Sequence, residues 1–125
     1  MQLTEDSNQS SIRIQKYSDH SIQINDKPYQ DSILISTSAV EIWPVQQFSE
    51  ISAALVEKII LRKPDIVIIG SGKQFQRLPQ TFQQQFHQHK IGVESMDTGA
   101  ACRTFAALAS EGRRVIAALI IEKNK

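Results

Sequence analysis

The sequence predicts a single α/β domain of three layers, with a central mixed, mostly parallel sheet, three helices and an N-terminal β-hairpin. Two observations carry this prediction. After residue 48, segments with helical spacing alternate with short apolar segments, which is typical of parallel strands joined by crossover helices. Before residue 36, apolar and polar residues alternate around polar turns, which indicates short antiparallel strands.

The N-terminal part of the chain is expected to contain the hairpin and one further strand. Its apolar positions alternate with polar ones on either side of a polar turn at residues 18–20. These positions are Ile12, Ile14, Ile22 and Ile24. A second turn at residues 25–28 leads to a third short strand at residues 32–35, and residues 37–47 are expected to be a connection.

The first two helices are expected on either side of a buried strand. Apolar residues recur at helical spacing across residues 48–59, with Ser49 as the cap of this helix and Pro64 as its stop. Residues 65–69 are nearly all β-formers and predict a buried parallel strand. Pro79 marks the start of the second helix, because its fixed backbone angle suits a first turn.

The third helix carries signals at both ends. Asp97 and Thr98 are natural N-caps, because their short side-chain oxygens accept hydrogen bonds from unpaired helix-start amides. Gly112 stands where a helix ends in a left-handed turn. Strands are expected before this helix at residues 91–96 and after it at residues 115–121, an unbroken apolar run that suits a central strand. The helix face expected against the sheet consists of Ala100, Ala101, Thr104, Ala107 and Leu108.

Composition limits the classes of function. The 125 residues predict one domain over residues 12–125, after a polar leader at residues 1–11 that we expect to be disordered. The 14 basic residues nearly balance the 13 acidic ones, which argues against nucleic-acid binding. No apolar run approaches the roughly 20 residues of a membrane-spanning helix, so no membrane insertion is expected. A single cysteine, Cys102, excludes an internal disulfide and fits a reducing cytoplasm. Residues 1–11 do not read as an arginine-rich mitochondrial presequence, so we expect a bacterial cytoplasmic protein.

The best candidate for a ligand site lies where two parallel strands end. Its residues are Gly70, Ser71, Gly72, Lys73, Asp97 and Thr98. Carboxyl ends of parallel strands meet at one edge of a sheet, where glycine amides, a lysine and a helix N-terminus would together favour an anion. The alternative is a tight turn beside a simple helix cap. Nucleotide fingerprints do not fit, because Phe75 stands where a third glycine would be required.

Neither a catalytic set nor a metal site is indicated. Cys102 lies within the third helix without a histidine beside it, and we expect a small buried residue there. His87 and His89 are two positions apart, which on a helix points them to different faces, whereas zinc ligands need a wider step and further partners. We therefore expect no metal ion and no cofactor, and no residue is identified as catalytic.

Four stretches of the chain resemble a known family. They are Pro64-Asp65 before a strand ending Gly70-Ser71-Gly72, then Val93-Glu94-Ser95-Met96-Asp97-Thr98, then Arg103-Thr104-Phe105, and finally Glu111-Gly112-Arg113-Arg114. They resemble the Mth-like domain family, which includes the mitochondrial complex I assembly factor 3 and the adipogenesis-associated Mth-like proteins. The similarity covers residues 12–122 and implies the Mth-like fold. The family usually reads Thr-Tyr-Asn where this chain has Thr104, Phe105 and Ala106, which removes two polar groups.

The resemblance also implies a protein partner. Arg103, Arg113 and Arg114 lie in the family-like stretches and are candidates for a partner-binding patch, since arginine is enriched at interface hot spots. The alternative is that all three are solvated surface residues. Trp43, beside Pro44, either anchors a partner or packs into the core.

Two functions therefore remain. The first is a non-enzymatic protein-interaction domain, which the resemblance implies to be an assembly factor for a respiratory-chain membrane complex. Its partner would be a subunit of that complex or a fellow assembly factor. The second is a small-molecule or anion-binding protein, with enzymes included, that uses the crevice at the strand ends.

Overall fold

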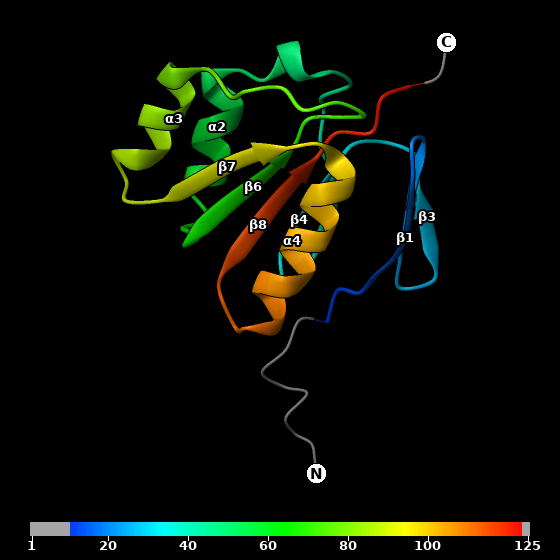
Figure 1. The fold of residues 1–125 in the computed structure, drawn as a ribbon. Coiled ribbons are helices and arrows are strands. Elements are labelled where there is room, and N and C mark those ends of the chain that lie inside the picture. The colour runs from blue at the N-terminus through cyan, green and yellow to red at the C-terminus, as the bar shows by residue number, and fades with distance from the viewer. Residues whose placement is uncertain (1–10, 124–125) are drawn as a thin grey trace.

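The computed structural model describes residues 11–123, which form two sheets and three α-helices (Figure 1). The central sheet has five strands in the order β5-β4-β8-β6-β7, and the smaller sheet has three in the order β1-β2-β3. The central strands are β4 (Ile33–Ile35), β5 (Val40–Ile42), β6 (Ile66–Gly70), β7 (Gly92–Met96) and β8 (Val115–Leu119). The smaller sheet contains β1 (Ile14–Ser18), β2 (Ser21–Ile24) and β3 (Lys27–Tyr29). The helices are α2 (Ala53–Ile60), α3 (Gln80–His87) and α4 (Thr98–Ser110), and a 3-10 helix, η1 (Phe48–Glu50), precedes them.

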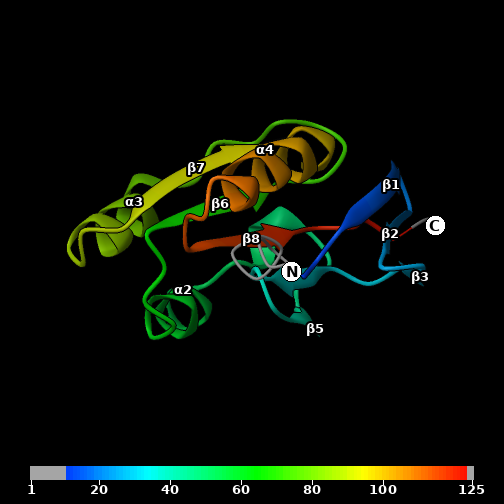
Figure 2. The ribbon, with the colours of Figure 1, turned by 90° about the horizontal axis from the view of Figure 1, so that it is seen from below.

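The predicted three-layer architecture is confirmed by which way the strand residues face. Along β6, Val67 and Ile69 pack into a core beneath α2 and α3, whereas Ile68 between them packs into a second core beneath α4 and the small sheet. This alternation is the period of two that a strand imposes on its side chains. Figure 2 shows α2 and α4 on opposite sides of the central sheet.

β8 is the central strand of the sheet, as its apolar run predicts. All five of its residues are buried, and it pairs with β6 in parallel and with β4 in antiparallel orientation. β6 also pairs with β7 in parallel, whereas β4 and β5 are antiparallel. The sheet is therefore mixed, with its parallel half on the β6–β7 side.

The smaller sheet and one edge strand differ from the prediction. The hairpin extends to a third strand, β3, through a tight turn in which Asn25 and Asp26 both have positive φ, as a type I′ hairpin turn requires. β5 lies within residues 37–47, which the sequence predicted to be a connection. Both elements are three residues long, too short to show a period of two.

The start of α2 corrects one prediction, and the two ends of α4 confirm two others. The cap of α2 is Ser52, whose hydroxyl accepts a bond from the Leu55 N–H at 3.3 Å, so the assignment of Ser49 was wrong. At α4, Asp97 is the cap and accepts from the Ala100 N–H at 2.9 Å, and Gly112 has a φ of +78°, both as predicted.

The buried face of α4 is shifted from the predicted one, because the large Phe105 takes a position against the sheet and Ala107 is exposed. The buried residues of this helix are Thr98, Gly99, Ala101, Cys102, Phe105 and Ala109.

The predicted leader lies outside the described residues, apart from Ser11. The N–H of Ser11 donates to the Thr37 carbonyl at 2.9 Å, so this residue is fixed to the start of the β4–β5 connection. Between residues 11 and 123, no helix is long and apolar enough to cross a membrane.

Candidate functional site

The structure brings together the residues of the predicted strand-end site. The loop after β6 meets the N-terminus of α4, and the Gly72 N–H donates to the Thr98 hydroxyl at 2.8 Å. In return, the Thr98 N–H donates to the Gly72 carbonyl at 2.9 Å. The approach is so close that a Cβ added to Gly70 would lie 2.9 Å from the Thr98 Cα. Glycine at position 70 therefore allows this helix to dock on the strand end.

The buried polar groups of this loop are already paired with other parts of the chain. Thr98 and Ser71 are completely buried. The Thr98 hydroxyl donates to the Ile120 carbonyl at 2.8 Å, and the Ser71 hydroxyl lies 2.7 Å from the Gln74 carbonyl. Buried polar groups with such partners stabilise a turn. The hydroxyls of Thr98 and Ser71 are thus already engaged within the chain, whereas the side chain of Lys73 in the same loop is exposed.

A carboxylate of the same chain lies where the glycine loop was expected to receive an anion. The Lys73 N–H donates to Oε1 of Glu122 at 3.1 Å. Gly72 has a φ of +109°, and a Cβ at this position would lie 2.7 Å from the Glu122 Cδ. Asp97 is likewise engaged as the cap of α4. Anion binding by these six residues thus stays a prediction that would require Glu122 to move.

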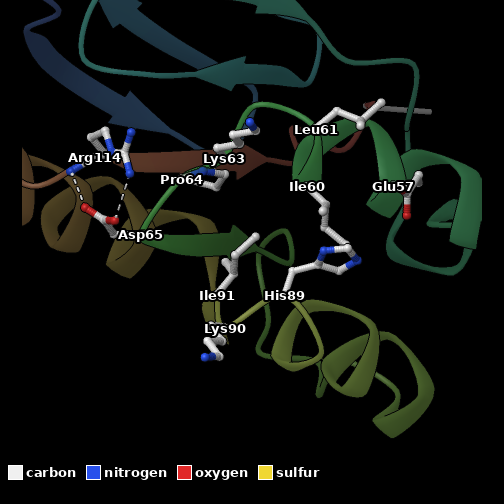
Figure 3. A pocket seen from close by; sticks show the side chains of 10 residues that line it. All are labelled: Glu57, Ile60, Leu61, Lys63, Pro64, Asp65, His89, Lys90, Ile91 and Arg114. Carbon is white, nitrogen blue, oxygen red and sulfur yellow. Dashed lines mark hydrogen bonds and ion pairs between the residues drawn. The ribbon is translucent and has the colours of Figure 1, made fainter.

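A cavity of about 530 Å³ lies at the other end of the parallel strands, beside the starts of β6 and β7 (Figure 3). Ile60 at the end of α2 and Ile91 before β7 contribute its apolar part. Its charged lining combines Glu57, Asp65, Lys63, Lys90 and Arg114, together with His89. Sequence reasoning missed this cavity, because its residues come from helix ends and strand starts that are far apart in the chain.

The charges around this cavity are mixed in sign. Lys63 and Lys90 both follow helix ends and have positive φ, a strained backbone for lysine. Each lies near a helix C-terminus, whose partial negative charge a cation offsets. Arg114 pairs with Asp65 at 3.3 Å, and this hydrogen bond lowers the pKa of the Asp65 carboxyl. Both side chains of the pair are exposed, so the pair contributes little to stability.

The candidate partner residues do not form one patch. Arg103 is exposed in the second turn of α4, whereas Arg113 and Arg114 follow the opposite end of that helix. Trp43 is 5% exposed and packs into the core beneath α2, which favours the packing alternative for this residue. Arg103 instead lines a cavity with Lys16 and Tyr17 of the hairpin.

The thiol of Cys102 is unreactive because the side chain is buried. Cys102 is 5% exposed, and burial raises the pKa of its thiol to about 12. A thiol with such a pKa is protonated at neutral pH and is a poor nucleophile. Within residues 11–123, no three or more His, Cys, Asp or Glu side chains gather in an arrangement that could hold a metal ion.

Comparison with known proteins identifies relatives over most of the chain. The NADH dehydrogenase (ubiquinone) 1 alpha subcomplex assembly factor 3 of Danio rerio is 31% identical over 109 residues, which are 86% of this chain and 63% of that protein. The human protein of the same name is 31% identical over 88% of this chain and 61% of its own length. The chain thus spans about three fifths of the length of these relatives.

Solved structures show the same fold. A protein from Bordetella parapertussis superimposes with a TM-score of 0.84 at 31% identity, over 90% of this chain and 98% of that one. A Bordetella pertussis protein described as a Mth938-like domain gives a TM-score of 0.80 at 25% identity, over 100% and 95%. A family model described as a protein of unknown function (DUF498/DUF598) matches residues 14–120. This chain therefore belongs to the DUF498/DUF598 family and has the Mth938-like fold.

Proposed function

We propose that this protein is a non-enzymatic protein-interaction domain that acts as an assembly factor for a respiratory-chain membrane complex. The observation that carries the proposal is the 31% identity to NADH dehydrogenase assembly factors over 86% of this chain. The match covers 63% of the relative, so the proposal concerns the function of this domain alone. The partner is a subunit of the complex or a fellow assembly factor, and the cytoplasm is the proposed compartment.

Surface chemistry supports a protein partner. The exposed arginines in the family-like stretches lie at both ends of α4, which gives the domain separate basic contacts. Arginine side chains bind carboxylates through two parallel hydrogen bonds and are frequent at interface hot spots. Arg103 also lies beside partly apolar surface of the hairpin, a combination typical of protein interfaces.

Affinity purification from the native cell tests the proposal. The full chain, tagged and expressed at its native level, is expected to recover one stoichiometric protein that belongs to a respiratory-chain complex or to its assembly machinery. A matched bait with the surface substitution Lys58→Glu, on the exposed side of α2, should recover the same protein. Recovery of no such protein, or turnover of a defined metabolite by the purified chain, would contradict the proposal.

A second function, small-molecule binding, is favoured by one observation. The cavity of about 530 Å³ beside the starts of β6 and β7 falls in the size range of ligand pockets. Thermal melts with a panel of charged metabolites would detect a ligand, because ligands that bind only the folded state raise its stability. A rise in melting temperature that Lys63→Gln and His89→Gln abolish would favour this alternative.

A further inference from the structure

Two adjoining cavities lie between the hairpin and α4. One has a volume of about 180 Å³ and the other about 230 Å³, and Ile14 and Ala106 line both. Together they form a continuous depression that we name the β1–α4 groove. Its walls are β1 with the residues just before it and one face of α4. The residues used below are Arg13, Ile14, Lys16, Gly99, Arg103 and Ala106.

The floor of the groove is made of small and apolar side chains. Gly99, Cys102, Ala106 and Ala109 follow one another at three- and four-residue steps, so they lie on one face of α4. Ile14 contributes the apolar part of the opposite wall and is only half-buried. Gly99, Cys102 and Ala109 are buried and Ala106 is exposed, so the apolar surface within reach of a partner is centred on Ala106 and Ile14.

A contact between Tyr17 and Gly99 closes the groove at the N-terminal end of α4. The ring of Tyr17 rests on Gly99, where an added Cβ would lie 3.1 Å from the Tyr17 Cε2. Burial raises the pKa of the Tyr17 hydroxyl, as expected for a ring held against a helix. Beyond this contact, β1 pairs with β2 alone, so its other edge carries no neighbouring strand within residues 11–123.

The rim of the groove is positively charged. Arg13, Lys16 and Arg103 are exposed, and none of them belongs to an ion pair within residues 11–123. Among the described residues, neither cavity is lined by an acidic side chain. Two carboxylates of the same elements are engaged within the chain: Asp97 caps α4, and Asp26 accepts a hydrogen bond from the Gln15 amide. The cavity beside β6, by contrast, is lined by cations and by two carboxylates.

We propose that the β1–α4 groove binds an extended acidic segment of a partner protein. The α4 wall runs from Gly99 to Ser110, which corresponds to about 16 Å of helix and therefore to about five residues of extended chain. Alternate apolar side chains of that segment lie on the floor, and its carboxylates face the three cations. Complementary charge selects the partner and speeds the encounter. This inference rests on the proposed protein-binding function.

Selection from a displayed library of short random peptides tests the groove directly. The probe is the library itself, and the bait is the full chain. Selected peptides are expected to alternate acidic and apolar residues and to bind less tightly as salt rises, because exposed charges are screened. In NMR spectra of the labelled chain, they should shift the amide signals of Ile14, Gly99 and Ala106. Selection of peptides without acidic residues would overturn the proposal.

Charge-reversed and filled variants show whether the groove is the site. The triple change Arg13→Glu, Lys16→Glu and Arg103→Glu should weaken selected peptides at least about tenfold. Ala106→Leu, which fills the groove without changing charge, should do the same. The control reverses Lys27, Lys58 and Arg77 to Glu, three exposed cations that line neither cavity, and should leave affinity within about twofold.

The groove and the wider function can fail separately. A triple variant that keeps its wild-type circular dichroism and still captures the native partner overturns the groove and leaves the proposed function standing. If the filled variant binds the selected peptides as tightly as the wild type does, the proposal is also wrong. Sedimentation that shows a dimer dissociated by the triple change would assign the groove to a second copy of this chain instead.

Discussion

Thr98 shows how one side chain can hold three segments together. Its hydroxyl accepts from the Gly72 N–H and donates to the Ile120 carbonyl, both at 2.8 Å and both away from solvent. The loop after β6, the start of α4 and the residue following β8 are therefore linked through one oxygen atom. The loops that were predicted to meet at the carboxyl ends of the strands do meet, and Thr98 joins them.

Replacement of Thr98 with valine should destabilise the protein by about 2 kcal/mol or more, because it leaves buried backbone groups without partners. Valine has nearly the same shape, so packing is preserved. Thr98→Ser keeps the hydroxyl and should retain most of the stability. Urea unfolding of the three proteins measures the difference. A valine variant within about 0.5 kcal/mol of the wild type would mean that the junction contributes no net stability.

Local residue chemistry was predictable where it acts within one turn of helix. Asp97 and Gly112 were identified correctly because capping depends on a few neighbouring residues. The contact of Glu122 with Lys73 was not predictable, because the two residues are 49 positions apart in the chain. No local pattern marks a carboxylate that will lie over a distant glycine.

At the scale of elements, the entry into α2 shows how apolar spacing can mislead. The apolar residues from Phe48 onward continue the helical period, yet residues 48–50 form a separate 3-10 helix. Ile51 follows with an extended backbone, at a φ of −64° and a ψ of +130°, and Ser52 then caps α2. Phe48 and Ile51 are buried all the same, so burial produced the pattern without a continuous helix.

The position of the cap gives a direct comparison of two serines. Ser52→Ala should cost about 1 kcal/mol, since it removes the acceptor for the Leu55 N–H. Ser49→Ala should change stability by less than about 0.5 kcal/mol, because Ser49 is exposed. Thermal melts at a common protein concentration would distinguish them. Equal losses for the two variants would indicate that the helix begins earlier in solution.

At the scale of the whole molecule, two cores lie on opposite faces of one sheet. Trp43 packs in the core beneath α2 and α3, and Cys102 packs in the core beneath α4. The fold class, the three layers and the central place of β8 were predictable from periodicity and from the length of apolar runs. The cavity beside β6 and the β1–α4 groove were not, because each is formed by surfaces that only the packing of distant elements brings together.

The two cores should unfold together, because β4, β6 and β8 contribute buried residues to both. Trp43 fluorescence and alkylation of Cys102 then give the same free energy of unfolding for opposite faces. The raised pKa of Cys102 adds stability that is fully present below the thiol's ordinary value of 9.0 and is lost as pH rises toward about 12. Measurements at pH 8 avoid that loss. Faster alkylation than the fluorescence predicts would reveal separate opening of the α4 face.

The central place of β8 also has a consequence for how the protein is made. β8 lies between β4 and β6 in the sheet but follows every other strand along the chain. While the ribosome is still synthesising residues 115–119, β4 and β6 have already been made without the neighbour that joins them. A nascent chain therefore exposes two unpaired strand edges, which are sites of aggregation. Folding of this sheet is completed only after β8, the strand that joins its two halves, has been translated.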